Sequence, residues 1–393
     1  MDHHILEMRA KFEELFDCSK DARLFFSPGR VNLIGEHTDY NGGHVFPCAL
    51  EIGTYALVSK REDRELRFYS LNEAKAGLIQ TDLDHADHYD PALGWVNYVM
   101  GMIHVFEKHG YTIPSGWNMV VYGNIPVASG LSSSASLEIL IGYILKTLFG
   151  FEVSGTDLAL MGQEDENKYI GLNCGIMDQF VIANGKKDHA LFLDTATLEY
   201  KTVPFVLKGR TLVIMNTNKP RGLKDSKYNE RRAECEKALK ILQSRLNIKT
   251  LGDLTDEEFD ANADLLKGDV IYKRAKHAVY ENTRTIKAVV VLRKNDIEAF
   301  GKLMDASHDS LRYDYEVTGA ELDALVDAAR SVKGTIGSRM TGAGFGGCAI
   351  AIVEDEALEE FKKTVREEYI QKIGYEPSFY EAVVGDGPKE IKE

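Results

Sequence analysis

The sequence predicts an α+β protein built from two domains. Its 393 residues exceed the ~100 to 200 residues of a usual domain, so a single core is not expected to hold them all. Strand-like apolar runs occur at Arg23–Phe26, Thr211–Asn216 and Cys348–Val353, and stretches with helical spacing separate them. The character of the sequence changes about halfway along, and we therefore predict domains over residues 1–205 and 206–393.

Composition excludes several classes of partner. Hydrophobic residues make up 44% of the chain and charged residues 27%, which is typical of a soluble protein with a large core. The formal net charge of −14 repels phosphate backbones and anionic lipid at long range. We therefore expect no nucleic-acid or membrane partner, and any anion site must be built locally.

Cysteine usage points to a reducing compartment. The five cysteines are odd in number, far apart and never in a CxxC pair: Cys18, Cys48, Cys174, Cys235 and Cys348. Neither a disulfide framework nor a zinc knuckle is indicated. The N-terminal segment lacks the apolar core of a signal peptide and has the spacing of an amphipathic helix. Together these features predict a cytoplasmic protein.

Other local patterns predict single elements. Alternation over Tyr55–Ser59 and Leu66–Ser70 predicts a hairpin. A final helix is expected over Glu356–Lys372, with Asp355 as its N-cap, and the tail after Val384 is expected to be disordered. Two histidines in an acidic loop, His85 and His88, are interpreted as solvated side chains and not as metal ligands.

The stretch from Gly123 to Phe149 predicts a phosphate site. Three consecutive serines, Ser132 to Ser134, precede a long helical pattern with one apolar face. The first turn of a helix offers unpaired N–H groups and a partial positive charge, and Gly130 allows close approach of the backbone. An ordinary serine-capped helix would give the same spacing, and the GxxxxGK[ST] loop of other nucleotide-binding proteins is absent.

A second polar stretch runs from Ser27 to Gly43. It places Glu36, His37 and Asp39 within four residues, just before an Asn-Gly-Gly turn. Carboxylates and an imidazole that converge from one loop can bind the hydroxyls of a neutral sugar. A polar turn whose side chains bond their own backbone is the alternative interpretation.

Two further features complete the motifs. Asp178 stands among apolar residues, so it is expected to be partly buried and to need a partner, in catalysis or in a structural salt bridge. The run Gly342–Gly347 satisfies GxGxxG, but the strand-like segment from Cys348 follows it where a dinucleotide site requires a helix. We interpret this run as a flexible turn beside the phosphate site.

Taken together, these motifs resemble a known family. GRVNLIGEHTDYNGG at Gly29–Gly43 resembles the signature of galactokinases, and GLSSSAS at Gly130–Ser136 resembles the phosphate motif of the GHMP kinase superfamily. SRMTGAGFGG at Ser338–Gly347 is similar to a third motif of that superfamily, and all three stand in family order. The resemblance extends from about Ser27 to Ile352.

The resemblance implies a fold and an activity. The fold would be a two-domain GHMP kinase, with an N-terminal ribosomal-protein-S5-like domain, a C-terminal ferredoxin-like α+β domain and the active site in the cleft between them. The activity would be phosphorylation of α-D-galactose at the anomeric hydroxyl by ATP with Mg²⁺, the first committed step of Leloir galactose metabolism. The protein would act as a monomer or weak homo-oligomer with galactose and ATP as its partners.

The resemblance also implies roles for single residues. Asp178 matches the galactokinase general base, and Arg30 matches its partner. The expected sugar contacts are Arg30, Glu36, His37, Thr38, Asp39, Gly175, Asp178 and Tyr228. The expected ATP contacts are Ser70, Trp95, Ala128, Ser129, Gly130, Leu131, Ser132, Ser133 and Ser134. The expected magnesium ligands are Ser134 and Glu166.

Two other functions stay open at this point. A GHMP kinase for a related sugar, such as N-acetylgalactosamine, would carry the same motifs, because they do not report the space beside the sugar's 2-position. A galactose- and ATP-sensing regulator is the alternative from another class. Some regulators of that kind lack the Ser-Ala pair of the serine motif, whereas Ser134-Ala135 is intact here.

Overall fold

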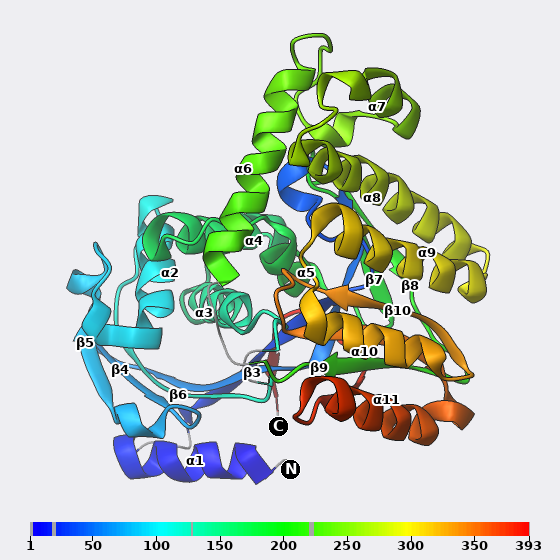
Figure 1. The fold of residues 1–393 in the computed structure, drawn as a ribbon. Coiled ribbons are helices and arrows are strands. Elements are labelled where there is room, and N and C mark those ends of the chain that lie inside the picture. Colours follow the sequence, from blue (N-terminus) through cyan, green and yellow to red (C-terminus); the bar gives the residue numbers. More distant parts are fainter. Residues whose placement is uncertain (1–2, 18–20, 127–128, 220–223, 393) are drawn as a thin grey trace.

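The computed structural model describes residues 3–17, 21–126, 129–219 and 224–392 (Figure 1). Helices and sheets are mixed throughout, which confirms the α+β prediction. A six-stranded sheet belongs mainly to the first half of the chain, and a four-stranded sheet belongs to the second half. The candidate site depends on how these two parts meet.

The larger sheet has the strand order β13-β1-β3-β6-β4-β5, with a parallel pair at β4–β6 and antiparallel pairs elsewhere. In that order the strands are Lys389–Ile391, Arg23–Asn32, Pro47–Lys60, Trp117–Gly123, Glu65–Ser70 and Ile79–Asp82. The helices around it are α1 (His3–Phe16), α2 (Asn97–Lys108), α3 (Ser133–Phe149), α4 (Gly155–Glu164) and α5 (Met177–Asn184).

Both faces of this sheet are covered, because its central strands are apolar on both sides. Leu57 and Val120 pack against α1 through Met8 and Phe12. Their neighbour Val58 faces the opposite way, into the core formed with α2, α3 and α5. Figure 1 shows α1 below the sheet and the other helices above it. The expected amphipathic N-terminal helix is confirmed.

The expected hairpin between residues 55–59 and 66–70 is wrong. Both segments are strands, but β6 lies between β3 and β4 in the sheet. Alternation of apolar and polar residues reports which face of a strand is buried, and it does not report which strand pairs with it.

The second half contains an antiparallel sheet with the order β10-β11-β9-β12. Its strands are Thr335–Thr341, Cys348–Glu354, Arg210–Asn216 and Ser378–Ala382, in that order. A small sheet joins β2 (His44–Val45), β7 (His189–Asp194) and β8 (Tyr200–Pro204). The helices are α6 (Lys224–Leu242), α7 (Asp256–Asn262), α8 (Val270–Arg293), α9 (Ile297–Ser310), α10 (Gly319–Ser331) and α11 (Leu358–Ile373).

A shared apolar core joins the two sheets. Val31 and Phe46, from β1 and the segment before β3, pack in one buried cluster with Ile214, Ile350 and Phe300. The last three residues come from β9, β11 and α9. This contact fixes the end of β1 against the C-terminal sheet, so loops from both halves of the chain face one another.

The C-terminal segment is more ordered than the sequence predicted. Val384 forms a β-bridge with Leu50, and β13 pairs with β1, so the expectation of a disordered tail after Val384 is wrong. The final helix is confirmed, but Asp355 is not its N-cap. The carboxylate of Asp355 instead accepts a hydrogen bond of 2.8 Å from Thr211.

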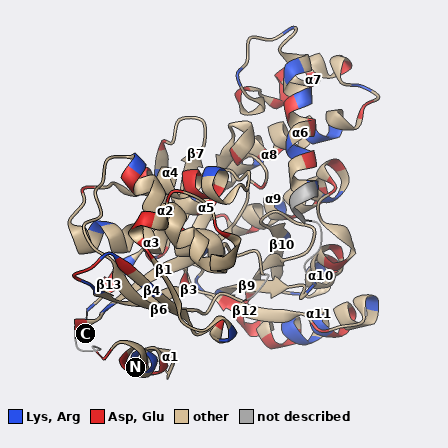
Figure 2. Ribbon diagram, turned by 90° about the vertical axis from the view of Figure 1, so that its left-hand side faces the viewer, with Lys and Arg blue, Asp and Glu red and all other residues tan. Residues whose placement is uncertain are grey.

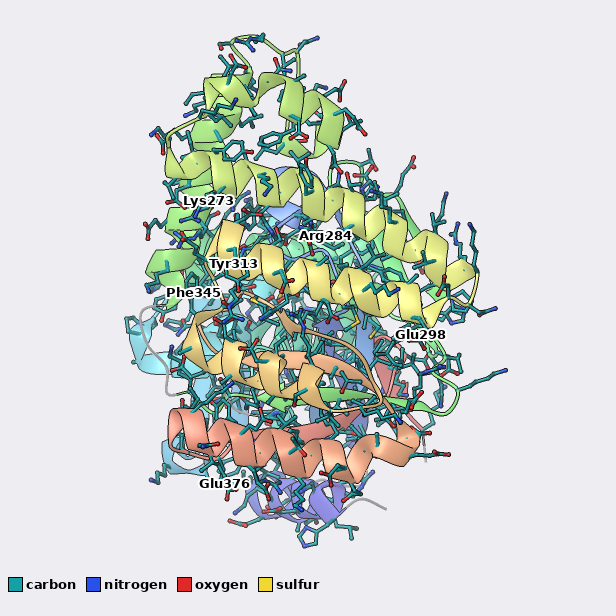
Figure 3. The ribbon with its side chains drawn as sticks, turned by 45° about the vertical axis from the view of Figure 1, so that its right-hand side comes forward. Lys273, Arg284, Glu298, Tyr313, Phe345 and Glu376 are labelled. Carbon is teal, nitrogen blue, oxygen red and sulfur yellow. The ribbon has the colours of Figure 1, made fainter. Side chains whose placement is uncertain are left out.

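Outer helices of the protein carry charged residues of both signs. Lysine, arginine and acidic residues are interspersed along α6 and α11 (Figure 2). Lys273 and Arg284 lie on α8, and Glu298 lies on α9 (Figure 3). Within the described ranges, no helix combines the length and the apolar character needed to cross a membrane.

Candidate active site

A cavity of about 270 Å³ opens between the two halves of the chain. Four segments line it: the end of β1 with the loop after it, the stretch from Glu166 to Asp178, the start of α6 at Tyr228, and Gly342 with Ala343. The first and last of these segments carry two of the motifs found in the sequence. The cavity is large enough for a small polar molecule, and carboxylates, backbone and aromatic rings form its walls.

Arg30 and Asp178 form a two-point contact at one wall. The Arg30 Nε and Nη2 atoms donate to the two carboxylate oxygens of Asp178, each over 2.7 Å. A register shift of β1 against β3, between Pro28 and Arg30, marks a bulge at this point of the strand. Arg30 is 5% exposed, whereas Asp178 keeps 29% of its side chain exposed at the cavity. The predicted pairing of Asp178 with Arg30 is confirmed.

Residues 129–134, which we call the serine turn, contact the same pair. Arg30 donates through Nη1 to the Gly130 carbonyl over 2.7 Å, and its backbone N–H donates to Leu131 over 3.2 Å. Ser132 has a left-handed backbone (φ 62°) and its hydroxyl donates to Asp178, not to the first turn of α3. The alternative of an ordinary serine-capped helix is therefore wrong.

The glycine-rich run lies beside the serine turn, as expected. A Cβ atom at Gly342 would stand 3.3 Å from the Gly130 carbonyl oxygen, and one at Gly347 would stand 3.3 Å from that of Ser129. Both glycines have positive φ angles, 84° and 78°. Only glycine gives this approach without strain, and the strand β11 follows directly. The interpretation against a dinucleotide site stands.

Ser134 and Glu166 offer oxygen atoms to a cation. The Ser134 hydroxyl donates to Glu166 Oε1 over 3.2 Å, which confirms that the two expected ligands are adjacent. Glu166 lies in the π-helical turn Asp165–Ile170, a geometry frequent at functional sites. Burial, followed by like charges, raises the pKa values of Glu138, Asp165 and Glu166.

This acidic group suits a divalent cation. No ion pair with a basic residue reaches these three carboxylates within the described part of the chain. Both oxygens of Asp165 and one oxygen of Glu138 are buried without a hydrogen-bond partner there. Hard oxygen donors with excess negative charge are the ligands that Mg²⁺ prefers.

Glu36 is almost fully enclosed. It is 1% exposed, and its carboxylate accepts from Arg339, from Asn32 Nδ2 over 2.9 Å and from the Gly342 N–H over 2.8 Å. Burial raises the pKa of Glu36, and the charge of Arg339 opposes this. A carboxylate has about four acceptor positions, so roughly one is left for a hydroxyl in the cavity.

His37 contributes ring surface to the cavity wall, because both of its ring nitrogens already have hydrogen-bond partners. Its Nε2 lies 3.2 Å from the Ala343 carbonyl, which only accepts, so Nε2 carries the proton and Nδ1 accepts from Tyr40 over 2.7 Å. Burial lowers the pKa of His37 to about 3. The Tyr228 ring lies 5.7 Å from the His37 ring and 5.4 Å from that of Tyr40. These rings form an aromatic wall.

Asp39 and Gly175 lie next to one another at the edge of the cavity. Burial, followed by the charge of Asp178, raises the pKa of Asp39 to about 6. A Cβ atom at Gly175 would stand 1.7 Å from Asp39 Oδ2, so the backbone there must be glycine for the carboxylate to keep its position. Both residues line the cavity, as the sugar-site prediction requires.

Thr38 differs from the other expected sugar contacts. It has no exposed surface and does not line the cavity. Its hydroxyl contacts the carbonyls of Gly35 and His44, at 2.9 Å and 2.7 Å. The side chain therefore closes the loop around Glu36 and His37, and the expected sugar contact of Thr38 stays a prediction.

The expected adenine contacts lie apart from this cavity. The Trp95 ring packs against Phe68 on β4, with ring centres 6.4 Å apart. Ser70 follows two residues later on β4, so its side chain points to the same face of the sheet. Ala128 lies outside the described residues. The nucleotide-base site stays a prediction.

Sequence reasoning missed three polar residues of the site. Arg339 lies within the third motif and Gln179 directly follows Asp178, but their partners are far away in the sequence. Tyr40, inside the first motif, contacts both His37 and Tyr315 at 2.7 Å. Arg339 and Tyr40 stand inside recognised motifs and Gln179 directly follows Asp178, and these positions were the available signal.

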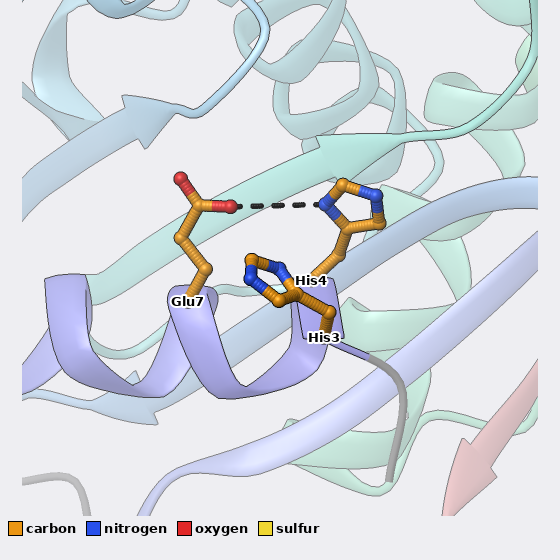
Figure 4. A group of neighbouring side chains, drawn as sticks. All are labelled: His3, His4 and Glu7. Carbon is orange, nitrogen blue, oxygen red and sulfur yellow. Dashed lines mark ion pairs between the residues drawn. The ribbon is translucent and has the colours of Figure 1, made fainter.

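Another group of potential metal ligands lies on α1. His3, His4 and Glu7 place their ligand atoms within 4.8 Å of one another, and His4 Nδ1 is 3.7 Å from Glu7 Oε2 (Figure 4). Because α1 covers the face of the sheet opposite to α3, this group takes no part in the candidate active site (Figure 1).

Three family models match the chain. The galactokinase galactose-binding signature matches residues 10–60, the GHMP kinase N-terminal domain matches residues 97–186, and the GHMP kinase C-terminal model matches residues 288–371. Among solved structures, a Methanococcus jannaschii mevalonate kinase is 18% identical with a TM-score of 0.65, covering 93% of this chain and 99% of that one. That likeness shows the GHMP kinase fold.

Relatives with higher sequence identity are named galactokinase. A galactokinase of Clostridium acetobutylicum is 55% identical over 97% of both chains, and one of Ligilactobacillus salivarius is 54% identical over 96% of this chain and 97% of its own. The structure of Lactococcus lactis galactokinase complexed with galactose is 50% identical, with a TM-score of 0.96 over 99% of this chain and 100% of that one. The chain therefore belongs to the galactokinase family, whose members are ATP-dependent sugar kinases with the GHMP kinase fold.

Proposed function

We propose that this chain transfers the γ-phosphoryl group of ATP to the anomeric hydroxyl of α-D-galactose, giving galactose 1-phosphate and ADP, the first committed step of galactose breakdown. One observation carries the proposal: inside the cavity, Arg30 and the Ser132 hydroxyl both contact the Asp178 carboxylate. A hydroxyl bound at Asp178 therefore lies beside the turn that begins α3. The galactose-complexed structure of the Lactococcus lactis relative supports the choice of sugar.

The cavity walls supply the sugar contacts. Glu36 has an acceptor position left, and Asp39 can accept from a second hydroxyl. Tyr228 and His37 present ring surface, which packs well on the apolar face of a sugar. Gly175 brings its backbone to the edge of the cavity. These groups orient the anomeric oxygen toward Asp178.

Asp178 acts as the general base. It accepts the proton of the anomeric hydroxyl while that oxygen bonds to the γ-phosphorus and the bond to the ADP oxygen breaks. Such help is typically worth ~10² to 10⁴ in rate. Arg30 holds the carboxylate at two points, and its positive charge lies beside the transferring group.

The serine turn holds the phosphates. Phosphoryl transfer has a loose transition state with negative charge spread over three oxygens, so positioning and charge stabilisation dominate. The N-terminus of α3 supplies N–H groups and the positive end of the helix dipole. Ser134 and Glu166 are the residues that would hold Mg²⁺. When bound, the ion neutralises phosphate charge.

The remaining parts of the proposal concern the nucleotide base and the compartment. Trp95 and Ser70 would contact the adenine side of ATP, since they share one face near the edge of the sheet. A cytoplasmic location is supported by Cys48, Cys174 and Cys235, which are thiols in the structure.

A substrate panel tests the proposal. Purified protein is assayed with ATP, Mg²⁺ and galactose, N-acetylgalactosamine or glucose, with ADP release as the readout and phosphorus NMR to identify the product. We expect the highest kcat/KM with galactose and an anomeric phosphate as the product. A preference for N-acetylgalactosamine would replace the sugar assignment. Galactose binding without any turnover would support the sensory alternative and overturn the proposal.

A further inference from the structure

Gln179 connects two of the buried carboxylates. Its side chain has no exposed surface, and its Nε2 atom donates to Glu166 Oε2 over 2.6 Å and to Glu138 Oε2 over 3.0 Å. Glu138 lies on α3, one turn after Ser134, and Glu166 lies in the π-helical turn after α4. A single amide nitrogen on α5 therefore bridges two other elements.

The bridge fixes which oxygen of Glu166 faces outward. An amide nitrogen has two N–H groups, and each carboxylate takes one of them. With Oε2 held by Gln179, the Oε1 atom of Glu166 lies next to the Ser134 hydroxyl, 3.2 Å away. Without the amide, two buried acidic side chains would face each other, and Glu166 would lose the contact that holds its Oε2 atom.

We propose that Gln179 is a positioning residue for the metal site: its amide separates Glu138 from Glu166 and aims Glu166 Oε1 beside Ser134, so that two oxygens face a divalent cation together. The same first turn of α5 carries Asp178, so one helix start sets both the base and the metal ligand. The inference rests on the proposed function, because it takes Ser134 and Glu166 as the cation ligands.

Manganese binding tests this role without relying on turnover. Mn²⁺ is titrated into the complex of the enzyme with β,γ-imido-ATP and followed by water proton relaxation. Gln179→Met keeps the side-chain volume but removes both N–H groups. We expect the Mn²⁺ affinity to fall by about 10- to 100-fold, as for other residues that orient metal ligands. Galactose affinity of the metal-free protein, measured by calorimetry, should stay within about twofold of wild type.

Two further variants separate the outcomes. Gln163→Met removes a comparable amide, which donates to the Cys174 carbonyl over 3.3 Å, and should leave the Mn²⁺ affinity unchanged. Glu166→Gln should lose Mn²⁺ binding; if it binds normally, the ligand assignment in the proposed function fails. If Glu166→Gln loses Mn²⁺ but Gln179→Met binds it as wild type does, only the positioning role is overturned. Should Gln179→Met not fold, Gln179→Asn, whose shorter amide cannot reach both carboxylates, decides by the same measurement.

Discussion

The Arg339 guanidinium and the Glu36 carboxylate form an ion pair with 0% and 1% of their side chains exposed, although 303 residues separate them in the sequence. Arg339 also donates to the carbonyls of Asn32 and Leu33, over 3.2 Å and 3.3 Å. Strand β10 thereby holds both the backbone and the carboxylate of the loop that lines the cavity. The geometry of this loop depends on the second half of the chain.

Loss of Arg339 should destabilise the whole protein. In Arg339→Met the buried Glu36 carboxylate keeps its position but loses its cation, and breaking a buried pair in this way costs about 3–5 kcal/mol. Urea unfolding followed by tryptophan fluorescence measures the change in the free energy of unfolding. The exposed pair Arg245–Asp264 provides the control, since Arg245→Met should shift the midpoint far less. Equal shifts for both variants would contradict the structural role of the buried pair.

Replacement of the base should affect turnover and spare nucleotide binding. Asp178→Asn keeps the size of the side chain but cannot accept the hydroxyl proton, so kcat should fall by about 10² to 10⁴. The affinity for ATP, measured by calorimetry, should remain near that of wild type, because the serine turn is held through backbone contacts to Arg30. A folded Asp178→Asn protein with near-normal kcat would remove the base assignment.

The pH dependence of galactose use should report Asp39. Burial raises the pKa of this carboxyl to about 6, so it is protonated below that pH and ionised above it. The ionised carboxylate is the stronger acceptor for the sugar hydroxyl that Asp39 is proposed to bind, so kcat/KM for galactose should fall as the pH drops through about 6. The profile is measured at saturating ATP, and Asp39→Asn should lack this acidic limb. A wild-type profile that stays flat across pH 6 would exclude Asp39 as the titrating group.

A single methyl group at Gly175 should impair sugar binding. The new Cβ atom would stand 1.7 Å from Asp39 Oδ2, so the carboxylate must move. Misplacement by about 1 Å can cost about 10²-fold, and we expect a loss of this order in kcat/KM for galactose with little change in KM for ATP. Gly123→Ala is the matched control, because its nearest neighbour atom would be 3.9 Å away. A normal galactose kcat/KM in Gly175→Ala would show that Asp39 tolerates displacement.

The sequence predicted the parts of the site that single segments carry. Arg30 and Asp178 were paired in advance because the family resemblance implied this contact, and the structure confirms it. The run from Gly342 was correctly separated from dinucleotide sites, since a strand follows it. In these two cases the features of single segments and the family resemblance were enough for a correct prediction.

Contacts between distant segments were beyond such patterns. The contact of Arg339 with Glu36 and that of Gln179 with Glu138 each join distant segments. No periodicity or spacing in the sequence indicates such contacts. The pairing of β3 with β6 was missed for the same reason. The division of the chain at residues 205 and 206 stays a prediction, and the return of β13 to the first sheet crosses it.

The pairing of β13 with β1 has a consequence for how the protein is made. Strand β1 carries Arg30, and in the six-stranded sheet it would be an unpaired edge without residues 389–391. Residues 389–391 are made long after β1 (Arg23–Asn32), so this edge has no partner on the growing chain until β13 has been synthesised. Exposed strand edges are sites of unwanted pairing with other chains. Completion of the six-stranded sheet therefore waits until β13 has been synthesised, and the edge of β1 is open to unwanted pairing up to that moment.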